Sequence, residues 1–438
     1  MPSVRVISLG CSKNTVDTEV LSGNLKAEKW TVLPEESPRA ADLTIINTCG
    51  FILDAKQESI DTVLRETARK NRRKKGHIIV MGCLVQRYAA ELRKEIPDVD
   101  AWIGVNDLDA VMKQARQILQ SEAARGSAVD PLRRKLTTPP HYAYLKVSEG
   151  CNRQCAFCAI PLIRGKHVSR PQEEIVEEAR RLVDGGVKEL ILVAQDLCYY
   201  GMDLYGRRAV ADLVRALCRI DGLHWLRLQY LYPHAFPDDL LEVMRTESKV
   251  CPYIDIPLQH INTKVLKDML RTTTKEETLT LLKKFKQALP DAAFRTTLIT
   301  GFPTEGEKEF KELKAFVGKF EFDRLGVFPY SQEEGTPAYP LGDPVPQEEK
   351  ERRAQEIMDL QEEISYRKNL FRVGNIYEVL IDREEGEFYV GRTVYDSPEV
   401  DNEVLIRRDA SPVLLPGHFY QVRITSAEAF DLYGKVEA

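Results

Sequence analysis

The stretch AYLKVSEGCNRQCAFCAIP, residues 143–161, joins a candidate strand to a loop rich in cysteine. Cys151, Cys155 and Cys158 follow the strand at the spacing C-x3-C-x2-C. Three thiols so close together in a chain without a disulfide pattern suit metal ligation better than disulfide pairing. We therefore expect a metal or cluster site in the loop that leaves this strand.

The motif supplies no fourth cysteine. A structural zinc site normally takes four protein ligands, and so does an electron-transfer iron–sulfur cluster. His167 is the nearest other candidate ligand, but it lies beyond Pro161 and Gly165. Three thiolates on a four-iron cluster would instead leave one iron open to a small bidentate ligand.

Further strand-like runs follow the motif at intervals of about 30–45 residues, which leaves room for a helix between neighbours. Six such units predict a partial (β/α)6 barrel, short of the eight units of a closed (β/α)8 barrel. The runs are residues 143–150, 189–196, 224–231, 253–260, 294–302 and 324–331.

The N-terminal part contains three apolar runs that each end in cysteine: VRVISLGC (4–11), DLTIINTC (42–49) and HIIVMGC (77–83). Helix-like segments near 14–27, 54–71 and 86–95 follow them, so we expect an open parallel α/β domain. The carboxyl ends of parallel strands face one ligand crevice. Cys11, Cys49 and Cys83 could therefore meet at one edge of the sheet.

The remaining segments differ in composition from these two α/β parts. Residues 346–370 combine helical periodicity with many charges, which predicts a solvated connector helix, and short strands with turns follow. The predicted fold is α/β with a small all-β barrel at the end. The expected domains are 1–121 (open parallel α/β), 122–141 (linker), 142–345 (partial barrel), 346–370 (connector) and 371–438 (β-barrel).

Composition indicates a cytoplasmic protein. The 438 residues carry a net charge of −5, and the start of the chain lacks a signal-peptide pattern. No apolar run approaches the roughly 18 residues of a membrane span, so we expect no membrane partner. Of the nine cysteines, Cys198, Cys218 and Cys251 match no motif, and we interpret them as structural.

The three-cysteine spacing, with the aromatic Phe157 before the last cysteine, resembles the radical S-adenosylmethionine (SAM) superfamily. The resemblance implies that the amino and carboxylate groups of SAM chelate the open iron. An electron from the cluster then cleaves SAM to a 5′-deoxyadenosyl radical.

The same resemblance implies a set of contacts to SAM. Gln195 and Asp196 correspond to the region that meets the methionyl amino group, and Arg164 could contact a carboxylate. Gln259 and the segment 299–305, with Gly301 and Glu305, correspond to regions near the ribose and adenine. Each of these residues could equally be a polar strand end that satisfies a loop.

The sequences GCSKNTVDTE, NTCGFILDA and GCLVQR, together with the motif and the terminal β-module, resemble the methylthiotransferase family over nearly the whole chain. This implies a second 4Fe–4S cluster on Cys11, Cys49 and Cys83, and a terminal TRAM domain. SAM would serve both as methyl donor and as radical source, with sulfur carried at the second cluster.

Other residues and partners follow from the same resemblance. An external electron donor such as flavodoxin or ferredoxin is implied. Lys13, Asn14 and Asp17 would either shape the pocket of the second cluster or cap the following helix.

Two branches of that family differ in substrate. GCSKN and NTCGFI look like the branch that modifies the β-carbon of an aspartate in ribosomal protein S12, rather than the branch that modifies tRNA adenosine. Ser12 departs from the proline common in the first branch. A tRNA methylthiotransferase is the alternative, and a non-enzymatic iron–sulfur electron carrier is a third that leaves the six-unit barrel unexplained.

The charge of the terminal module agrees with a protein substrate. Residues 371–438 contain seven basic and thirteen acidic residues. Contacts to phosphate dominate the affinity of nucleic-acid-binding modules, so we expect no stable nucleic-acid binding. An acidic module would complement a basic ribosomal protein, although the acidity could also serve solubility alone.

Overall fold

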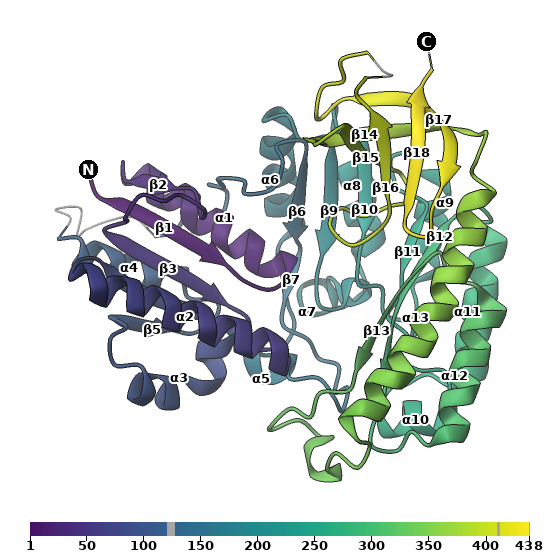
Figure 1. Ribbon diagram of the computed structural model, residues 1–438, viewed down its shortest axis with the longest axis horizontal. Helices are drawn as coiled ribbons and strands as arrows, with labels where there is room; N and C mark the ends of the chain where they lie inside the picture. Colours follow the sequence, from purple (N-terminus) through teal and green to yellow (C-terminus); the bar gives the residue numbers. More distant parts are fainter. Residues whose placement is uncertain (121–127, 410–411, 438) are drawn as a thin grey trace.

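The computed structural model describes residues 1–120, 128–409 and 412–437 of the chain. Figure 1 shows three parts: a parallel α/β domain at the N-terminus, a larger half-barrel in the centre and a small β-barrel at the C-terminus. The predicted fold class is confirmed. None of the helices described is long and apolar enough to cross a membrane.

The N-terminal domain is a five-stranded parallel sheet in the order β2-β1-β3-β4-β5. Its strands are β1 (Ser3–Ser8), β2 (Thr31–Leu33), β3 (Leu43–Thr48), β4 (His77–Gly82) and β5 (Ala101–Ile103). Its helices are α1 (Ser12–Ala27), α2 (Leu53–Arg73), α3 (Cys83–Glu95) and α4 (Leu108–Ile118). The three predicted strands are confirmed as β1, β3 and β4, whereas the two edge strands have only three residues each and gave no clear pattern.

The central domain contains the six predicted strands as two three-stranded parallel sheets, β6-β9-β10 and β11-β12-β13, which continue one arc. Only an isolated bridge, Leu226 with Val250, marks the seam on the β10 side. The strands are β6 (Tyr142–Lys146), β9 (Glu189–Val193), β10 (Trp225–Leu228), β11 (Tyr253–Asp255), β12 (Ala293–Thr300) and β13 (Arg324–Pro329). A short antiparallel pair, β7 (Ser148–Glu149) and β8 (Val168–Ser169), flanks the cysteine loop.

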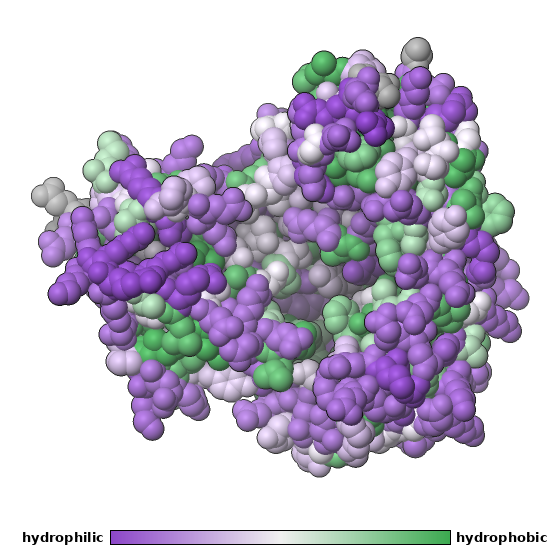
Figure 2. Space-filling view, viewed as in Figure 1, coloured by the Kyte–Doolittle hydropathy of each residue, from purple (hydrophilic) through white to green (hydrophobic). Residues whose placement is uncertain are grey.

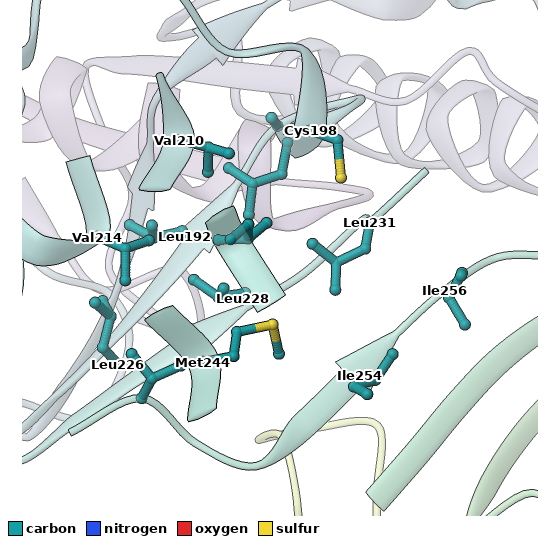
Figure 3. Packing of buried hydrophobic residues seen from close by; sticks show 14 of the residues in the cluster. Leu192, Cys198, Val210, Val214, Leu226, Leu228, Leu231, Met244, Ile254 and Ile256 are labelled. Carbon is teal, nitrogen blue, oxygen red and sulfur yellow. The ribbon is translucent and has the colours of Figure 1, made fainter. Parts of the chain in front are cut away.

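Helices cover the outer face of this arc and enclose the largest core (Figure 1). The helices of the central domain are α5 (Ile160–Arg164), α6 (Gln172–Asp184), η1 (Leu197–Tyr199), α7 (Met202–Tyr205), α8 (Val210–Cys218), α9 (Asp238–Thr246), α10 (Thr263–Asp268), α11 (Lys275–Ala288), α12 (Glu307–Phe320) and η2 (Tyr339–Leu341). Of these, α5 packs instead against α3 of the N-terminal domain. Figure 3 shows Cys198 within this packing, beside Val210 and Leu231. Cys218 and Cys251 are also buried, which agrees with a structural role for all three thiols.

Helix α13 (Gln347–Leu370) is more than the solvated connector that its charges predicted. It runs along β13 and α12, and one face of it is buried against the half-barrel (Figure 1). Lys350 and Arg353 lie on that face beside Ile357 and Ile364. These two charged side chains can be buried because each forms an ion pair. The many charges of this segment therefore concealed, at the level of sequence, the buried side chains along one face of the helix.

The C-terminal domain is a closed five-stranded barrel in the order β14-β15-β16-β18-β17. Its strands are β14 (Ile376–Glu385), β15 (Phe388–Thr393), β16 (Glu403–Arg407), β17 (Phe419–Ala427) and β18 (Asp431–Val436). The interior is filled by inward-facing aliphatic side chains such as Val379, Val404, Val422 and Leu432. Closure of the barrel removes exposed strand edges.

The loop between β15 and β16, residues 394–402, docks this barrel onto the half-barrel. Arg324 Nε, at the start of β13, donates to Asp396 Oδ1 (2.9 Å), and the Tyr253 hydroxyl, at the start of β11, donates to Asp401 Oδ2 (2.6 Å). The hydroxyls of Tyr142 and Tyr144 donate to Glu399 (3.0 and 3.3 Å). The small barrel therefore covers the amino ends of the central strands.

The segment after α4 ties the first two domains together. Arg134 pairs with Glu19 of α1 and with Glu178 of α6 (2.8 Å to the latter), and its side chain is 2% exposed. Residues 128–141 therefore belong to the domain interface, while 122–127 of the predicted linker lie outside the described residues. The exact limits of the predicted domains stay predictions.

Candidate functional site

The loop that carries Cys151, Cys155 and Cys158 lies at the carboxyl end of β6, between β7 and α5. Backbone hydrogen bonds fix it at both ends: Cys151 N donates to Gly165 O (3.1 Å) and Ala156 N donates to Met269 O (2.8 Å). The loop is therefore held by the half-barrel before any ligand binds.

The surroundings of these thiols favour a bound cation. Burial raises the pKa of Cys151 to about 11 and that of Cys158 to about 12, and the neighbouring Cys155 thiol adds to both shifts. Cys155 Sγ lies 3.7 Å from Arg271 Nη1 and 3.9 Å from the hydroxyl of Tyr232. Thiols that are costly to ionise here would be held as thiolates by iron, so the donor set fits a cluster.

Gln195 and Asp196 follow β9 directly and lie beside this loop. Gln195 Nε2 donates to Glu149 Oε1 (2.8 Å), and Asp196 Oδ2 accepts from Arg153 Nε (2.8 Å). The side-chain oxygen of Gln195, Oε1, and the second carboxylate oxygen of Asp196, Oδ1, are buried and have no partner among the described residues. Buried acceptors are normally paired, so two unpaired ones indicate a ligand with donor groups.

Gln259 and Phe157 lie at the same end of the half-barrel. Gln259 has a φ of +70°, a left-handed conformation that non-glycine residues rarely adopt, and its backbone bonds to Thr297 and Ile299 of β12 hold it there. Such strain concentrates at functional sites. Phe157 is half-buried and packs with Phe302 behind the cysteine loop.

Gly301 and Glu305 are occupied by contacts within the protein. A Cβ at Gly301, whose φ is +72°, would lie 2.2 Å from Lys350 Cγ of α13. Glu305 is buried, accepts from Gly301 N (2.9 Å) and pairs with Arg353 (2.8 Å). His260 Nε2 lies 3.2 Å from the other Glu305 oxygen. These two residues hold the loop after β12 against α13.

Cys11, Cys49 and Cys83 follow the adjacent strands β1, β3 and β4, whose carboxyl ends point toward the half-barrel (Figure 1). Gly10 makes this convergence possible, because a Cβ at its φ of +95° would lie 2.8 Å from Cys49 Cβ. Gly82 does the same next to Cys83, where a Cβ would lie 2.6 Å from Thr48 O. The structure thus brings together three thiols that are far apart in sequence.

Asn14 touches all three of these cysteine loops. Its Nδ2 donates to Leu9 O (2.7 Å) and to Thr48 O (3.2 Å), and its Oδ1 lies 4.0 Å from Cys83 Sγ. The N-cap of α1 is Cys11, and no side chain caps this helix end. Helix capping therefore does not explain the position of Asn14. The geometry favours the alternative, in which Asn14 shapes the pocket of the second cluster.

The buried thiols of this second triad resemble those of the first. Burial raises the pKa of Cys49 to about 11, with further contributions from Cys83 and Cys11. Burial also raises the pKa of Cys83, and Arg164 opposes that shift through its charge and a hydrogen bond. Cys11 is exposed, which leaves the triad open on one side.

A single zinc ion is the alternative to a cluster at the first triad. Among the described residues, no group of three or more His, Cys, Asp or Glu side chains is found that could hold one metal ion. A four-iron cluster spreads its cysteine ligands farther apart than a single ion does. His167 Nε2 lies 2.9 Å from Ser169 Oγ and is used in a separate contact.

A buried polar network lies between the two triads. Arg164 Nη2 donates to Asn14 Oδ1 (2.5 Å), and its Nη1 donates to Glu149 Oε2 (2.8 Å). Lys146 Nζ pairs with Glu149 (2.9 Å) and also with Asp17 of α1. Arg164, expected to contact a carboxylate of SAM, is therefore already used by carboxylates of the protein.

Sequence reasoning singled out Arg164, Asn14 and Asp17 but not the contacts among them, and it missed Lys146 and Glu149. The available signal for these two was a pair of charges at the end of an otherwise apolar strand run. Lys13 Nζ of α1 also lies 3.2 Å from the ring centroid of Tyr230. Figure 2 shows that the molecular face is hollowed between the N-terminal domain and the half-barrel.

Family models match most of the chain. That of the radical SAM superfamily matches residues 145–317, that of the TRAM domain residues 373–436, and that of "Uncharacterized protein family UPF0004" residues 3–104. The central domain is therefore a radical SAM domain, which implies one 4Fe–4S cluster and SAM.

Solved structures share the fold. The radical SAM methyltransferase TsrM from Kitasatospora setae superposes with a TM-score of 0.56 over 77% of each chain, at 12% identity. The cobalamin-dependent radical SAM enzyme OxsB has a TM-score of 0.51 over 82% of this chain and 56% of its own, at 14% identity. At these identities the likeness shows the fold alone.

Curated relatives match the whole chain. The proteins named "Ribosomal protein uS12 methylthiotransferase RimO" from Christiangramia forsetii and Flavobacterium psychrophilum are 49% and 50% identical to it. Each alignment covers 99% of this chain, and 94% and 97% of the respective relative. The predicted resemblance to radical SAM methylthiotransferases is confirmed. The chain belongs to the RimO family of ribosomal protein uS12 methylthiotransferases.

Proposed function

We propose that this protein transfers a methylthio group to the β-carbon of an aspartate in ribosomal protein uS12. The observation that supports this most strongly is the pairing of two three-cysteine sites, one on each side of a single domain interface. The full-length similarity to uS12 methylthiotransferases supports the same substrate.

Each triad would hold one 4Fe–4S cluster: Cys151, Cys155 and Cys158 in the half-barrel, and Cys11, Cys49 and Cys83 in the N-terminal domain. When bound, the first cluster with SAM would supply the radical that removes hydrogen, and the second would carry the sulfur that is transferred. SAM would also donate the methyl group. The protein orients these groups and excludes water, because the hard chemistry belongs to the cofactors.

Asp196 and Gln195 would bind the amino group of SAM with their unpaired oxygens. Gln259 would contribute from its strained position in the segment after β11, and Phe157 would pack behind the cysteine loop. Gly301 and Glu305 would act indirectly, because their contacts go to α13. They would set the shape of the loop that faces the nucleoside part of SAM.

The choice of uS12 now rests on the relatives more than on the charge of the terminal barrel. Five of its thirteen acidic residues bond to the half-barrel or to the segment before β6, namely Glu378, Asp382, Asp396, Glu399 and Asp401. The acidity therefore serves docking in part, and attraction of a basic protein is a weaker argument than the composition suggested.

An external one-electron donor, such as flavodoxin or ferredoxin, would reduce the cluster of the half-barrel. Such a donor must approach within electron-transfer distance of that cluster. The hollow between the first two domains (Figure 2) is the side from which both donor and substrate would reach the site.

The test is anaerobic reaction of the reconstituted full-length protein with SAM, a reductant and either uS12 or unmodified tRNA. Mass spectrometry of both substrates should show a methylthio adduct on the aspartate of uS12 and none on tRNA. An adduct on tRNA alone would overturn the proposed substrate. SAM that stays intact in the presence of reductant would overturn the proposed radical chemistry.

A further inference from the structure

Arg164 is the side chain that connects the two cysteine sites. It ends α5, which follows Cys158 directly, yet its Nη2 donates to Asn14 of the N-terminal domain (2.5 Å). Asn14 in turn holds the backbone before Cys11 and before Cys49. One guanidinium therefore links a segment of one site to all the loops of the other.

The other side of the guanidinium is anchored in the half-barrel. Nη1 donates to Glu149 Oε2 (2.8 Å), two residues before Cys151, and lies 3.4 Å from Asp17 Oδ2. The Arg164 side chain is only 2% exposed, so these contacts form in a region of low dielectric where they are strong. Arginine suits such a place because its donors have a fixed fork geometry.

The charge of Arg164 also reaches the second triad. Its Nη2 donates to Asn14 Oδ1 (2.5 Å), and that oxygen lies 4.0 Å from Cys83 Sγ, so the guanidinium lies near this thiol. A permanent positive charge beside a ligand stabilises the more negative state of the group that the ligand holds. Partners in the second shell of a metal site orient the ligands and tune the metal in this way.

We propose that Arg164 is a positioning residue that sets the N-terminal cluster site in register with the radical SAM site and places a positive charge beside Cys83. This rests on the proposed function and deepens it. Sulfur held in the N-terminal domain must lie within reach of a carbon radical formed in the other domain. Small errors in such placement cost large factors in rate.

A second arginine at the same interface holds the two domains together without contacting the cysteine loops. Arg134 is equally buried at 2% exposed, and it also pairs with one carboxylate of each domain, Glu19 and Glu178. Its partners belong to α1 and α6 and not to the cysteine loops. Loss of Arg134 would weaken docking, whereas loss of Arg164 would also disturb the register of the two sites.

The experiment compares R164Q, R164K and the matched control R134Q in the full-length protein with both clusters reconstituted. The first readout is the number of methylthio groups formed per 5′-deoxyadenosine released, which measures coupling and not overall activity. The second is the reduction potential of the N-terminal cluster, measured by EPR in a background with Cys151, Cys155 and Cys158 changed to Ala. Lys146 still pairs with Glu149 and Asp17 in both Arg164 variants, which favours folding.

R164Q should lower the coupling ratio by about tenfold, the lower end of effects seen for second-shell partners of metal sites. It should also shift the potential of the N-terminal cluster to a more negative value. R164K should keep the reduction potential near that of the wild type, because lysine retains the positive charge. Its coupling ratio should still fall, because lysine lacks the fork of hydrogen-bond donors of a guanidinium. R134Q should change neither readout.

Three results would overturn the proposal: R164Q with wild-type coupling and potential, R164K with full coupling, or R134Q with the same defects as R164Q. Selective loss of the N-terminal cluster in R164Q, with iron retained in R134Q, would support the proposal. In that case the coupling ratio would be measured in R164K instead of R164Q. Failure of the wild-type protein to modify uS12 would instead contradict the proposed function.

Discussion

The two cysteine triads reach similar surroundings by different routes. Cys151, Cys155 and Cys158 belong to one loop, whose short spacing alone brings the thiols together. Cys11, Cys49 and Cys83 meet only because three parallel strands lie side by side and glycines allow their loops to touch. The first site depends on local sequence, whereas the second depends on the packing of a whole domain.

The largest effect should come from the local site. Changing Cys151, Cys155 and Cys158 to Ala should remove about half of the bound iron and sulfide and abolish release of 5′-deoxyadenosine, because these thiolates are the proposed cluster ligands. Iron analysis and chromatography of the SAM products measure this. An unchanged iron content would contradict the assignment of the motif.

The assembled site should give the complementary result. Changing Cys11, Cys49 and Cys83 to Ala should also remove about half of the iron but leave SAM cleavage in place, while methylthiolation of uS12 is lost. The two triple variants should thus lose different clusters. Loss of SAM cleavage in this variant would show that the two sites are not independent.

A single backbone change should break only the assembled site. In G10A the added Cβ would lie 2.8 Å from Cys49 Cβ, so the N-terminal cluster should be lost while that of the half-barrel remains. G206A is the matched control, since Gly206 also has a positive φ of +66° but nothing within 4 Å of an added Cβ. It should keep both clusters at a cost of about 1 kcal/mol in unfolding free energy.

A change beside the local site should weaken SAM binding without removing iron. D196N keeps the shape of Asp196 and removes its charge, so the Kd for SAM should rise about 10- to 100-fold, as for loss of a charged hydrogen bond. Anaerobic equilibrium binding measures this. D212N, at an exposed pair with Arg207, should leave the Kd unchanged.

The smallest effect should lie far from both triads, at the docked barrel. Burial alone would raise the pKa of Asp382, but Arg392 and His141 hold it below its ordinary value of 3.8. A carboxyl with a depressed pKa stabilises the fold above that value and loses this contribution as the pH falls through the folded pKa.

D382N should therefore lower the unfolding free energy by about 2 kcal/mol at neutral pH, as for hydrogen bonds to a charged group. Its stability should also fall less steeply than that of the wild type below about pH 4. Denaturant titrations at several pH values measure both quantities. Parallel pH profiles for the two proteins would contradict the role of this carboxylate.

Much of the fold could be predicted because long apolar runs mark buried parallel strands. The predicted run 253–260 became the shorter β11 (Tyr253–Asp255), since Pro257 lacks a donor and Gln259 adopts a positive φ. The edge strands β2 and β5 are too short for a pattern. The buried face of α13 was hidden because it carries charged residues whose partners lie outside the helix: Asp343 for Lys350, and Glu305, 48 residues away, for Arg353.

The candidate site likewise has features that could be predicted from the sequence and features that could not. The positions of the cysteines, Gln195 and Asp196 could be predicted because these residues follow strands or have a fixed spacing. The contact of Arg164 with Asn14 could not, because 150 residues separate them and the register of two domains decides it. The partners of Gly301 and Glu305 likewise come from α13, outside their own segment.

The loop 394–402 has a consequence for exchanging parts between related enzymes. Its Asp396 and Asp401 belong to the C-terminal barrel, but their hydrogen-bond donors, Arg324 and Tyr253, belong to the half-barrel. A hybrid that took only the barrel from a relative would have to bring matching residues at these strand starts as well. The two domains therefore have to be exchanged together with their contact residues, and a graft that respects only the boundary in the chain would leave buried carboxylates without partners.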